Sequence, residues 1–422
     1  MEYIPIIVLV LSFIGLLSIG MPVAWSIAIS SVLTMMVSIP ALPAFTTVSQ
    51  RMGTGLDSFA LLAIPFFILS GQLMNKGGIA HRLIAFAKTL VGSLPGGLAL
   101  INVIGAMLMG AIAGSAMASA SAMGSILGPE MEKEGYSREF GAAVNITSAT
   151  TGLIIPPSNI LIVYSLASGG VSIAALFLAG YIPGILTGLF LMLVASFWAK
   201  KKKYKLGKRS SLKEIVKTFI DAVPSLFLLV IVIGGIITGI FTATEASAIA
   251  VLYTLVLGFI YKEISFKSLP EILLDSSITT AIVMLLIGAS MSMSWVMSYE
   301  NIPQNISSAL LGISNNIIVI LLIINLLLLF VGVFMDMTPA VLIFTPIFLP
   351  VVTELGMDPI QFGIIMVLNL CIGLCTPPVG SVLFVGVGVA QTTIQKVIKP
   401  LLPLFLAMVV ALFLVTYIPE LT

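Results

Sequence analysis

Charged side chains are scarce in this chain of 422 residues. They make up 9% of it, whereas an ordinary soluble domain has roughly 25%. Hydrophobic residues make up 59%. One globular core cannot bury so much apolar surface, so lipid must be the solvent for most of the chain. The composition therefore excludes a soluble enzyme, a nucleic-acid-binding protein and a disordered chain, and the net charge of +2 indicates no polyanionic partner.

Residues that carry redox or metal chemistry are also rare. Cys371 and Cys375 are the two cysteines, and His81 is the one histidine. This excludes a disulfide framework and a histidine-rich metal site. The sequence has no Walker A motif, so we expect no ATP hydrolysis by this chain. Titratable residues at membrane depth are too few for acid–base catalysis, so we expect no enzyme.

Apolar runs long enough to span a membrane recur along the whole chain and predict an all-α polytopic membrane protein. The predicted spans are 4–20, 22–39, 59–75, 140–168, 173–199, 219–240, 244–261, 278–297, 360–391 and 398–419. Two further apolar blocks, 98–133 and 316–355, are interrupted near their middles. Each block suits either two spanning helices or a re-entrant helical hairpin that enters the membrane and returns.

The two halves of the sequence resemble each other weakly when one is shifted by 221 residues. The pair Pro156-Pro157 then falls on Pro377-Pro378, and Gly152 falls on Gly373. This spacing predicts two repeats, 1–200 and 218–422, joined by a basic linker at 201–217. The first repeat contains the hairpin 98–133 and a broken helix at 140–168, and the second contains the hairpin 316–355 and a broken helix at 360–391.

Lysine and arginine predict how the chain is oriented. Nine of the 19 lie between Lys200 and Lys217, which places this linker in the cytoplasm. Each repeat crosses the membrane an odd number of times, whether its hairpin spans or returns. The repeats are therefore predicted to be inverted, with both termini periplasmic; Arg51 alone disagrees. Inverted repeats with broken helices are typical of secondary transporters, and the amphipathic segments 76–92 and 300–313 are expected along the interface.

Asp336 and Ser115 occupy the interruptions of the two hairpin blocks. A carboxylate at membrane depth costs about 2.5–3.5 kcal/mol and needs a cation or hydrogen-bond donors. Asp336 is therefore a candidate ligand for a coupling ion, a proton carrier, or an N-cap for the helix that follows. Ser115, followed by Ser119, is a candidate cavity-lining hydroxyl, although small residues also favour tight helix packing.

The two diproline motifs are the strongest local signal. Consecutive prolines remove two amide donors and break the helix, so carbonyls of the preceding turn need a cation or another donor. Sodium fits, because it is a hard cation that prefers oxygen ligands; the alternative is a proline kink packed against its neighbours. The candidate sodium ligands are Ser115, Gly152, Ile155, Pro157, Gly332, Asp336, Thr376 and Val379. The candidate solute-binding residues are Ser115, Ser119, Ser158, Asn159, Asp336 and Ser381.

Several of these motifs together resemble the large membrane subunit (DctM-like) of a tripartite ATP-independent periplasmic (TRAP) transporter. The resemblance covers nearly the whole chain. It is carried by IPFF at 64–67, GAIAGS at 110–115, TTGLIIPP at 150–157, MDMTP at 335–339 and TPP at 376–378.

The resemblance implies an elevator-type sodium symporter of the bacterial inner membrane. A transport domain with two hairpins would move against a scaffold that includes helices in 1–60 and 219–261. Expected partners are a small membrane subunit, as a separate four-helix polypeptide, and a periplasmic substrate-binding protein, with no nucleic acid. The implied solutes are organic anions such as C4-dicarboxylates or sialic acid, and overall similarity favours sialic acid.

Two other functions remain open at this point. One is an ion-coupled anion transporter that works alone, which a requirement for a binding protein would exclude. The other is a non-transporting membrane scaffold, which would not explain matched broken helices and an aspartate at membrane depth.

Overall fold

The computed structural model describes residues 4–207, 209–314 and 316–422. Over these residues the chain forms nineteen α-helices and two short 3-10 helices, with no strand. Eight helical segments of the described part are long and apolar enough to cross a membrane. The prediction of an all-α polytopic membrane protein is therefore confirmed.

The helices follow one another with short connections. The first half contains α1 (Ile4–Ser18), α2 (Val23–Ser38), α3 (Ala41–Gly55), η1 (Phe59–Leu62), α4 (Ala63–Lys76), α5 (Ile79–Val91), α6 (Gly97–Ala113), α7 (Ala116–Lys133), α8 (Arg138–Thr151), α9 (Asn159–Ala167) and α10 (Ile173–Lys201). The second half contains α11 (Leu212–Ile237), α12 (Ala243–Ile260), α13 (Leu269–Tyr299), α14 (Ile302–Ile313), α15 (Ile317–Phe334), α16 (Met337–Glu354), α17 (Pro359–Gly373), α18 (Ser381–Val389), α19 (Ile394–Tyr417) and η2 (Pro419–Leu421).

The basic linker is shorter than the predicted segment 201–217. Helix α11 already begins at Leu212, because Ser211 and Glu214 form a reciprocal capping box. In this arrangement the serine hydroxyl accepts from the third helical N–H, and the glutamate accepts from the N-cap N–H. A strong local start signal thus extends the helix into sequence that is too polar to span a membrane.

Two further differences from the predicted spans have simple causes. Helix α3 was not predicted, because Thr, Ser, Gln and Arg interrupt its apolar residues. Helix α13 begins at Leu269, whereas its predicted span begins at residue 278, because a proline in its first turn and Glu271 favour an earlier start.

The described helices repeat with the spacing seen in the sequence. Helix α16 lies 221 residues after α7 at both of its ends, and α17 begins 221 residues after α8. Both diproline bonds, Pro156–Pro157 and Pro377–Pro378, are cis. The matching element order agrees with two repeats, and their inversion across a membrane stays a prediction.

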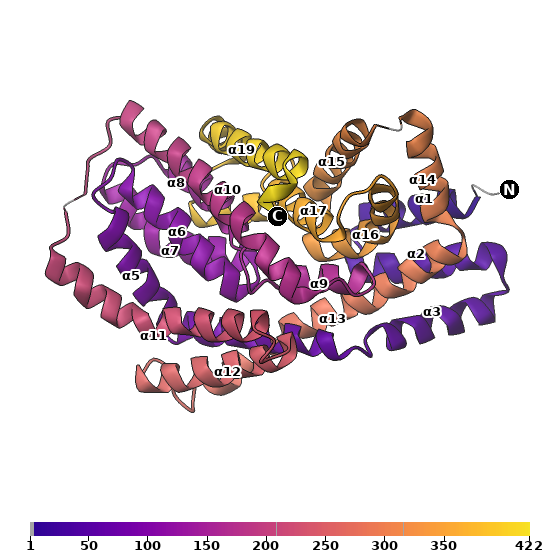
Figure 1. Ribbon diagram of the computed structural model, residues 1–422, viewed down its shortest axis with the longest axis horizontal. Coiled ribbons are helices and arrows are strands. Elements are labelled where there is room, and N and C mark those ends of the chain that lie inside the picture. Colours follow the sequence, from indigo (N-terminus) through magenta and orange to yellow (C-terminus); the bar gives the residue numbers. More distant parts are fainter. Residues whose placement is uncertain (1–3, 208, 315) are drawn as a thin grey trace.

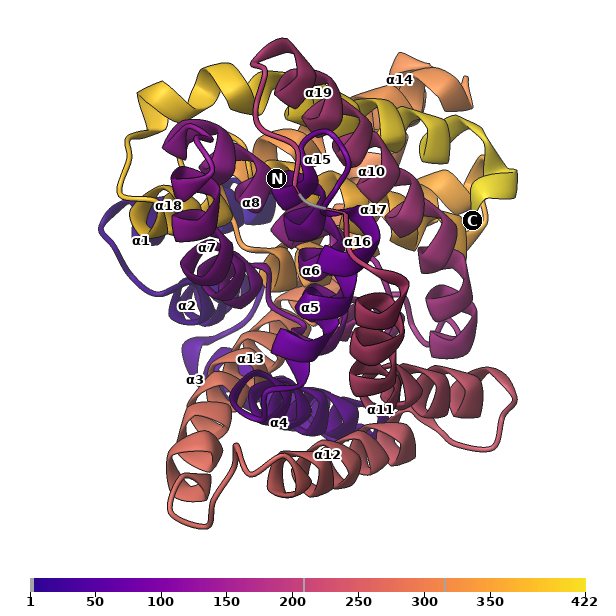
Figure 2. The same cartoon turned by 90° about the vertical axis from the view of Figure 1, so that its left-hand side faces the viewer.

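Figures 1 and 2 both place α11, α12 and α13 along one side of the molecule, with α10 and α19 on the other side. Helix α4 packs against α12 and α13 on the first side. From there α5 leads to the first hairpin, α6–α7, and α14 leads to the second, α15–α16. Each hairpin is therefore attached to the α4–α12–α13 side through a short amphipathic helix.

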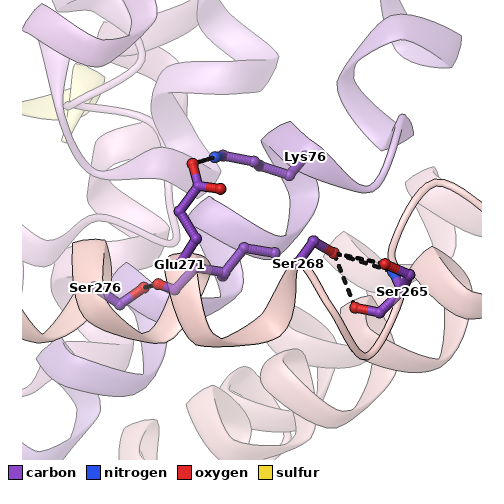
Figure 3. A network of polar contacts seen from close by, with 6 residues as sticks. Lys76, Ser265, Ser268, Glu271 and Ser276 are labelled. Atoms are coloured by element: carbon purple, nitrogen blue, oxygen red, sulfur yellow. Dashed lines mark hydrogen bonds and ion pairs between the residues drawn. The ribbon is translucent and has the colours of Figure 1, made fainter.

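An ion pair joins the ends of α4 and α13 (Figure 3). Lys76 Nζ lies 2.6 Å from Glu271 Oε1. Ser268 donates to the carbonyl of Ser265 (2.9 Å) just before α13. An exposed ion pair stabilises a fold by only about 0–1 kcal/mol. The pair nevertheless shows that the last turn of α4 lies close to the first turn of α13.

The centre of the molecule depends on close backbone contacts. A Cβ on Gly152 would lie 2.4 Å from Gly110 Cα, and a Cβ on Gly373 would lie 2.6 Å from Gly332 Cα. Glycine at these positions lets α6 approach the end of α8, and α15 approach the end of α17. The side chain of Cys371 also contacts α8, with its Sγ 3.3 Å from the carbonyl oxygen of Thr150.

Candidate functional site

The tips of the two hairpins meet the second halves of the two broken helices at one cavity of about 330 Å³. Four residues predicted from the sequence line it: Ser115, Asn159, Asp336 and Ser381. They come from four elements, namely the start of α7, the start of α9, the start of α16 and the start of α18. The volume falls in the lower part of the range for small-molecule sites.

The first hairpin tip uses its serine to begin α7. Ser115 Oγ accepts a hydrogen bond from the backbone N–H of Ala118 (3.3 Å), which is a standard N-cap. Gly114 turns the chain with a φ of +61°, and a Cβ there would lie 2.3 Å from Nδ2 of Asn159. The Asn159 amide therefore lies over the hairpin tip. Ser115 serves as a cap and lines the cavity, so both predicted roles are compatible with its position.

The second hairpin tip is built differently. Asp336 is the N-cap residue of α16, yet its side chain makes no capping hydrogen bond within the described residues. Among the described residues that line the cavity, Asp336 is the single charged one; the lining contains no lysine or arginine. The carboxylate is thus available to a ligand, and the fixed charge of the site favours a cation.

Two buried polar atoms of the cavity lining have no hydrogen-bond partner in the described part of the chain. They are Oδ1 of Asn159 and Oγ of Ser381. Burying such groups without a partner costs about 1–3 kcal/mol each. Both residues are the first of their helices, where backbone N–H groups are free and the helix dipole is positive. The cavity therefore offers acceptors for a cation or donor as well as donors for an anion.

Two other predicted hydroxyls are satisfied locally. Ser158 Oγ donates to the carbonyl of Leu153 across the break between α8 and α9. Thr376 Oγ1 donates to the carbonyl of Ile372 (2.7 Å) at the end of α17. Ser119 is fully buried on α7, and its Oγ has no partner among the described residues. None of these three residues is among the described residues that line the cavity.

The remaining predicted sodium ligands are not among the described residues that line the cavity. Gly152 and Gly332 lie at the two helix–helix contacts described above, which explains why glycine is needed there. Ile155 packs against α10, where a Cβ on Gly184 would lie 2.4 Å from it, and Val379 is 40% exposed. Pro157 is buried in its break. The binding of sodium by the backbone carbonyls of these residues stays a prediction.

Four polar residues of the cavity lining were not predicted from the sequence, and one of them, Thr338, follows Asp336 in the first turn of α16. Gln72 and Asn75 lie on α4, and Thr279 lies on α13. An amide pair three residues apart in an apolar helix was the available signal, since residues at this spacing share a helix face. The sequence could not show that this face meets the hairpin tips.

Comparison with known proteins shows which family the sequence of this chain resembles. The sequence profile of the family described as "Tripartite ATP-independent periplasmic transporter, DctM component" matches residues 10–421. The uncharacterized protein YgiK of Salmonella typhimurium is 56% identical over 422 residues, which cover 100% of this chain and 97% of YgiK. The isethionate TRAP transporter permease protein DctMQ of Oleidesulfovibrio alaskensis is 41% identical over 417 residues, covering 98% of this chain and 65% of that protein.

The fold is also found in a solved structure. The YdaH transporter of Alcanivorax borkumensis superposes with a TM-score of 0.66 at 14% sequence identity, covering 90% of this chain and 89% of that one. At this identity the similarity concerns the fold alone.

Proposed function

The chain belongs to the DctM family of TRAP transporter components and is a secondary transporter subunit for organic acids; on that premise, we propose that it imports its solute in symport with sodium by an elevator motion. The cavity between the hairpin tips is the proposed transport site. The observation that carries the proposal is the charge of this cavity, where Asp336 has no cationic side chain beside it in the described lining.

An anion that binds beside the ionised carboxylate of Asp336 is repelled unless a cation or a proton compensates the charge. Two like charges about 4 Å apart repel by about 1 kcal/mol in water and by about 4 kcal/mol at an effective dielectric constant of 20. With no lysine or arginine in the described lining, a bound metal cation is the simplest compensation. Sodium and solute should then each raise the affinity of the other, because binding linkage is reciprocal.

The proposed sodium ligands combine side chains and backbone. Asp336 supplies a carboxylate and Ser115 a hydroxyl, both in the cavity lining. Carbonyl oxygens come from the ends of α8 and α17 and from the diproline breaks, together with Gly332 on α15. These breaks leave carbonyls that no helical N–H can reach.

The architecture supports a moving transport domain. The hairpins and broken helices contact the cavity from one side, and faces of α4 and α13 contact it from the other. The proposed motion carries the hairpins and broken helices across the membrane against the scaffold that contains α4, α12 and α13. As proposed partners, a small membrane subunit completes this scaffold and a periplasmic binding protein delivers the solute at the inner membrane.

The proposed solute is a small organic anion that carries a carboxylate or a sulfonate. The family resemblance suggests sialic acid or a C4-dicarboxylate, and the relative DctMQ is named for isethionate. Backbone N–H groups in the first turns of α7, α9 and α18 can donate to any of these anionic groups, although the Ala118 N–H of α7 already donates to Ser115. Solute identity is therefore to be decided by a direct transport panel.

The test is uptake by liposomes that contain this chain and its small membrane subunit, with the binding protein outside. We expect uptake of one panel member, among sialic acid, succinate and isethionate, that requires an inward sodium gradient and the binding protein. Equal uptake in potassium would overturn sodium coupling. Uptake without the binding protein would instead favour a transporter that works alone.

A further inference from the structure

One wall of the cavity belongs to α4 and α13, not to the hairpins. On α4 the lining residues are spaced by four, three, one and three positions, so they form one helix face. They are Ile64, Ile68, Gly71, Gln72 and Asn75. On α13 the spacing is three, one and three, and the residues are Thr279, Ile282, Val283 and Leu286.

Polar groups are concentrated at one end of this wall. On α4 the isoleucines come first and the two amides lie in the last turns, next to Lys76. On α13 Thr279 is the described lining residue nearest along the helix to Glu271. Lys76 and Glu271 form an ion pair, so the end of α4 lies near the start of α13. Gln72, Asn75 and Thr279 line the cavity toward these ends of their helices.

The amides of Gln72 and Asn75 are available to a ligand. Both residues are half-buried, and neither side chain is hydrogen-bonded to another residue of the described part of the chain. Thr279 already donates to the carbonyl of Asp275 (2.9 Å) and keeps its acceptor capacity. Each free amide can donate two hydrogen bonds and accept others, which suits carboxylate, sulfonate and hydroxyl groups alike.

We propose that Gln72 and Asn75, together with Thr279 in the lining of the same cavity, form a polar strip that binds the solute while the transport site is open to the cytoplasm. This inference rests on the proposed function. The predicted orientation places the Lys76–Glu271 end of the wall in the cytoplasm, so the strip lies on the release path. The apolar end offers no partner to an anion and separates the site from the periplasm.

The absence of cationic side chains from the described lining suits a release site. Uncharged amides can hydrogen-bond an anion, but they do not add the opposite charge and the bidentate geometry by which arginine holds a carboxylate. The strip would therefore hold a desolvated anion and release it readily to water.

The experiment measures the half-saturating solute concentration from each side of liposomes that contain the complete transporter. Gln72→Met and Asn75→Leu preserve volume and remove hydrogen bonds. We expect each to raise the half-saturating concentration on the cytoplasmic side by roughly 3- to 10-fold, as for one lost hydrogen bond. Half-saturation from the periplasmic side and the sodium dependence should stay unchanged. Gln50→Met, on an exposed position of α3, is the matched control.

A charge-introducing variant keeps the test decisive if the apolar variants do not fold. Gln72→Glu keeps the side-chain length and adds a charge that repels an anion, so it should raise the cytoplasmic half-saturating concentration more than Gln72→Met does. If wild-type uptake is sodium-driven and all of these variants keep the wild-type cytoplasmic value, the strip is wrong and the proposed function stands. If wild-type uptake ignores sodium, the proposed coupling itself fails.

Discussion

Asp336→Asn is the substitution that tests the transport site most directly. It removes one negative charge and keeps the shape and one oxygen of the side chain. Because the carboxylate makes no capping hydrogen bond in the described structure, the helix start of α16 should survive. Asparagine is also a good N-cap residue, so the protein should assemble normally.

The expected loss of sodium affinity follows from the lost charge. A unit charge pair about 4 Å apart is worth about 4 kcal/mol at an effective dielectric constant of 20. Since every 1.4 kcal/mol is a factor of ten, the loss corresponds to roughly a thousandfold weaker sodium binding. The remaining amide oxygen reduces this figure, so we expect a loss of about 100- to 1,000-fold.

The assay titrates sodium against uptake in liposomes and, separately, against Tm of the purified complex. The sodium-induced rise in Tm should disappear in Asp336→Asn, because a ligand stabilises the state that it binds. Asp358→Asn is the matched control. Asp358 caps α17 through the N–H of Ile360 (2.6 Å), a role that asparagine can fill, so the sodium response should be unchanged.

Two outcomes would refute the reasoning in different ways. An unchanged sodium response in Asp336→Asn would mean that the carboxylate is not a sodium ligand. Loss of sodium dependence together with a new dependence on pH would indicate that Asp336 carries a proton.

Three further experiments probe the tip, the packing and the topology. Ser115→Ala removes both a cap and a cavity hydroxyl and should weaken solute binding by about 1 kcal/mol or more. The control is Ser125→Ala, because the Ser125 hydroxyl donates to a carbonyl of its own helix, and this variant should transport normally. Equal losses in the two variants would contradict the tip site. Gly152→Ala should lower Tm by overpacking worth about 1–3 kcal/mol, since its Cβ would lie 2.4 Å from the backbone of α6; an unchanged Tm would show that the helices separate freely. Cysteines placed by Ser210→Cys and Thr422→Cys should react with an impermeant maleimide from the cytoplasmic and the periplasmic side respectively, because the native cysteines are buried; labelling from the same side would overturn the inversion.

The helix interruptions were predictable from the sequence, because their causes are local. Two consecutive prolines break any helix, and Gly114 permits the left-handed turn that precedes Ser115. Apolar runs likewise predicted most of the spans. Helix α3 was missed because hydropathy does not detect a short helix with a mixed composition.

The contents of the cavity were predictable only in part. Residues at the interruptions, such as Ser115 and Asp336, were expected to meet, and they line one cavity. The hydroxyls of Ser158 and Thr376 are satisfied by nearby carbonyls, which residue type alone does not reveal. The amides of Gln72 and Asn75 share a helix face, but a sequence does not show which helix face a distant hairpin will meet.

The contact between α8 and α17 limits which pairs of side chains the two halves of the sequence can combine. Cys371 lies 221 residues after Thr150, the residue whose carbonyl its thiol contacts. At this point a position therefore touches its own counterpart in the other half, as at the axis of a symmetric dimer, where a surface has to fit itself. A bulky side chain cannot be introduced on both sides of such a contact, although one side can enlarge if the other becomes smaller. The side chain of Thr150 contacts the chain just after α17, with its Oγ1 3.8 Å from Sγ of Cys375. We expect the substitutions Thr150→Val and Cys375→Ser to be non-additive in their effects on stability, as is usual for residues in direct contact.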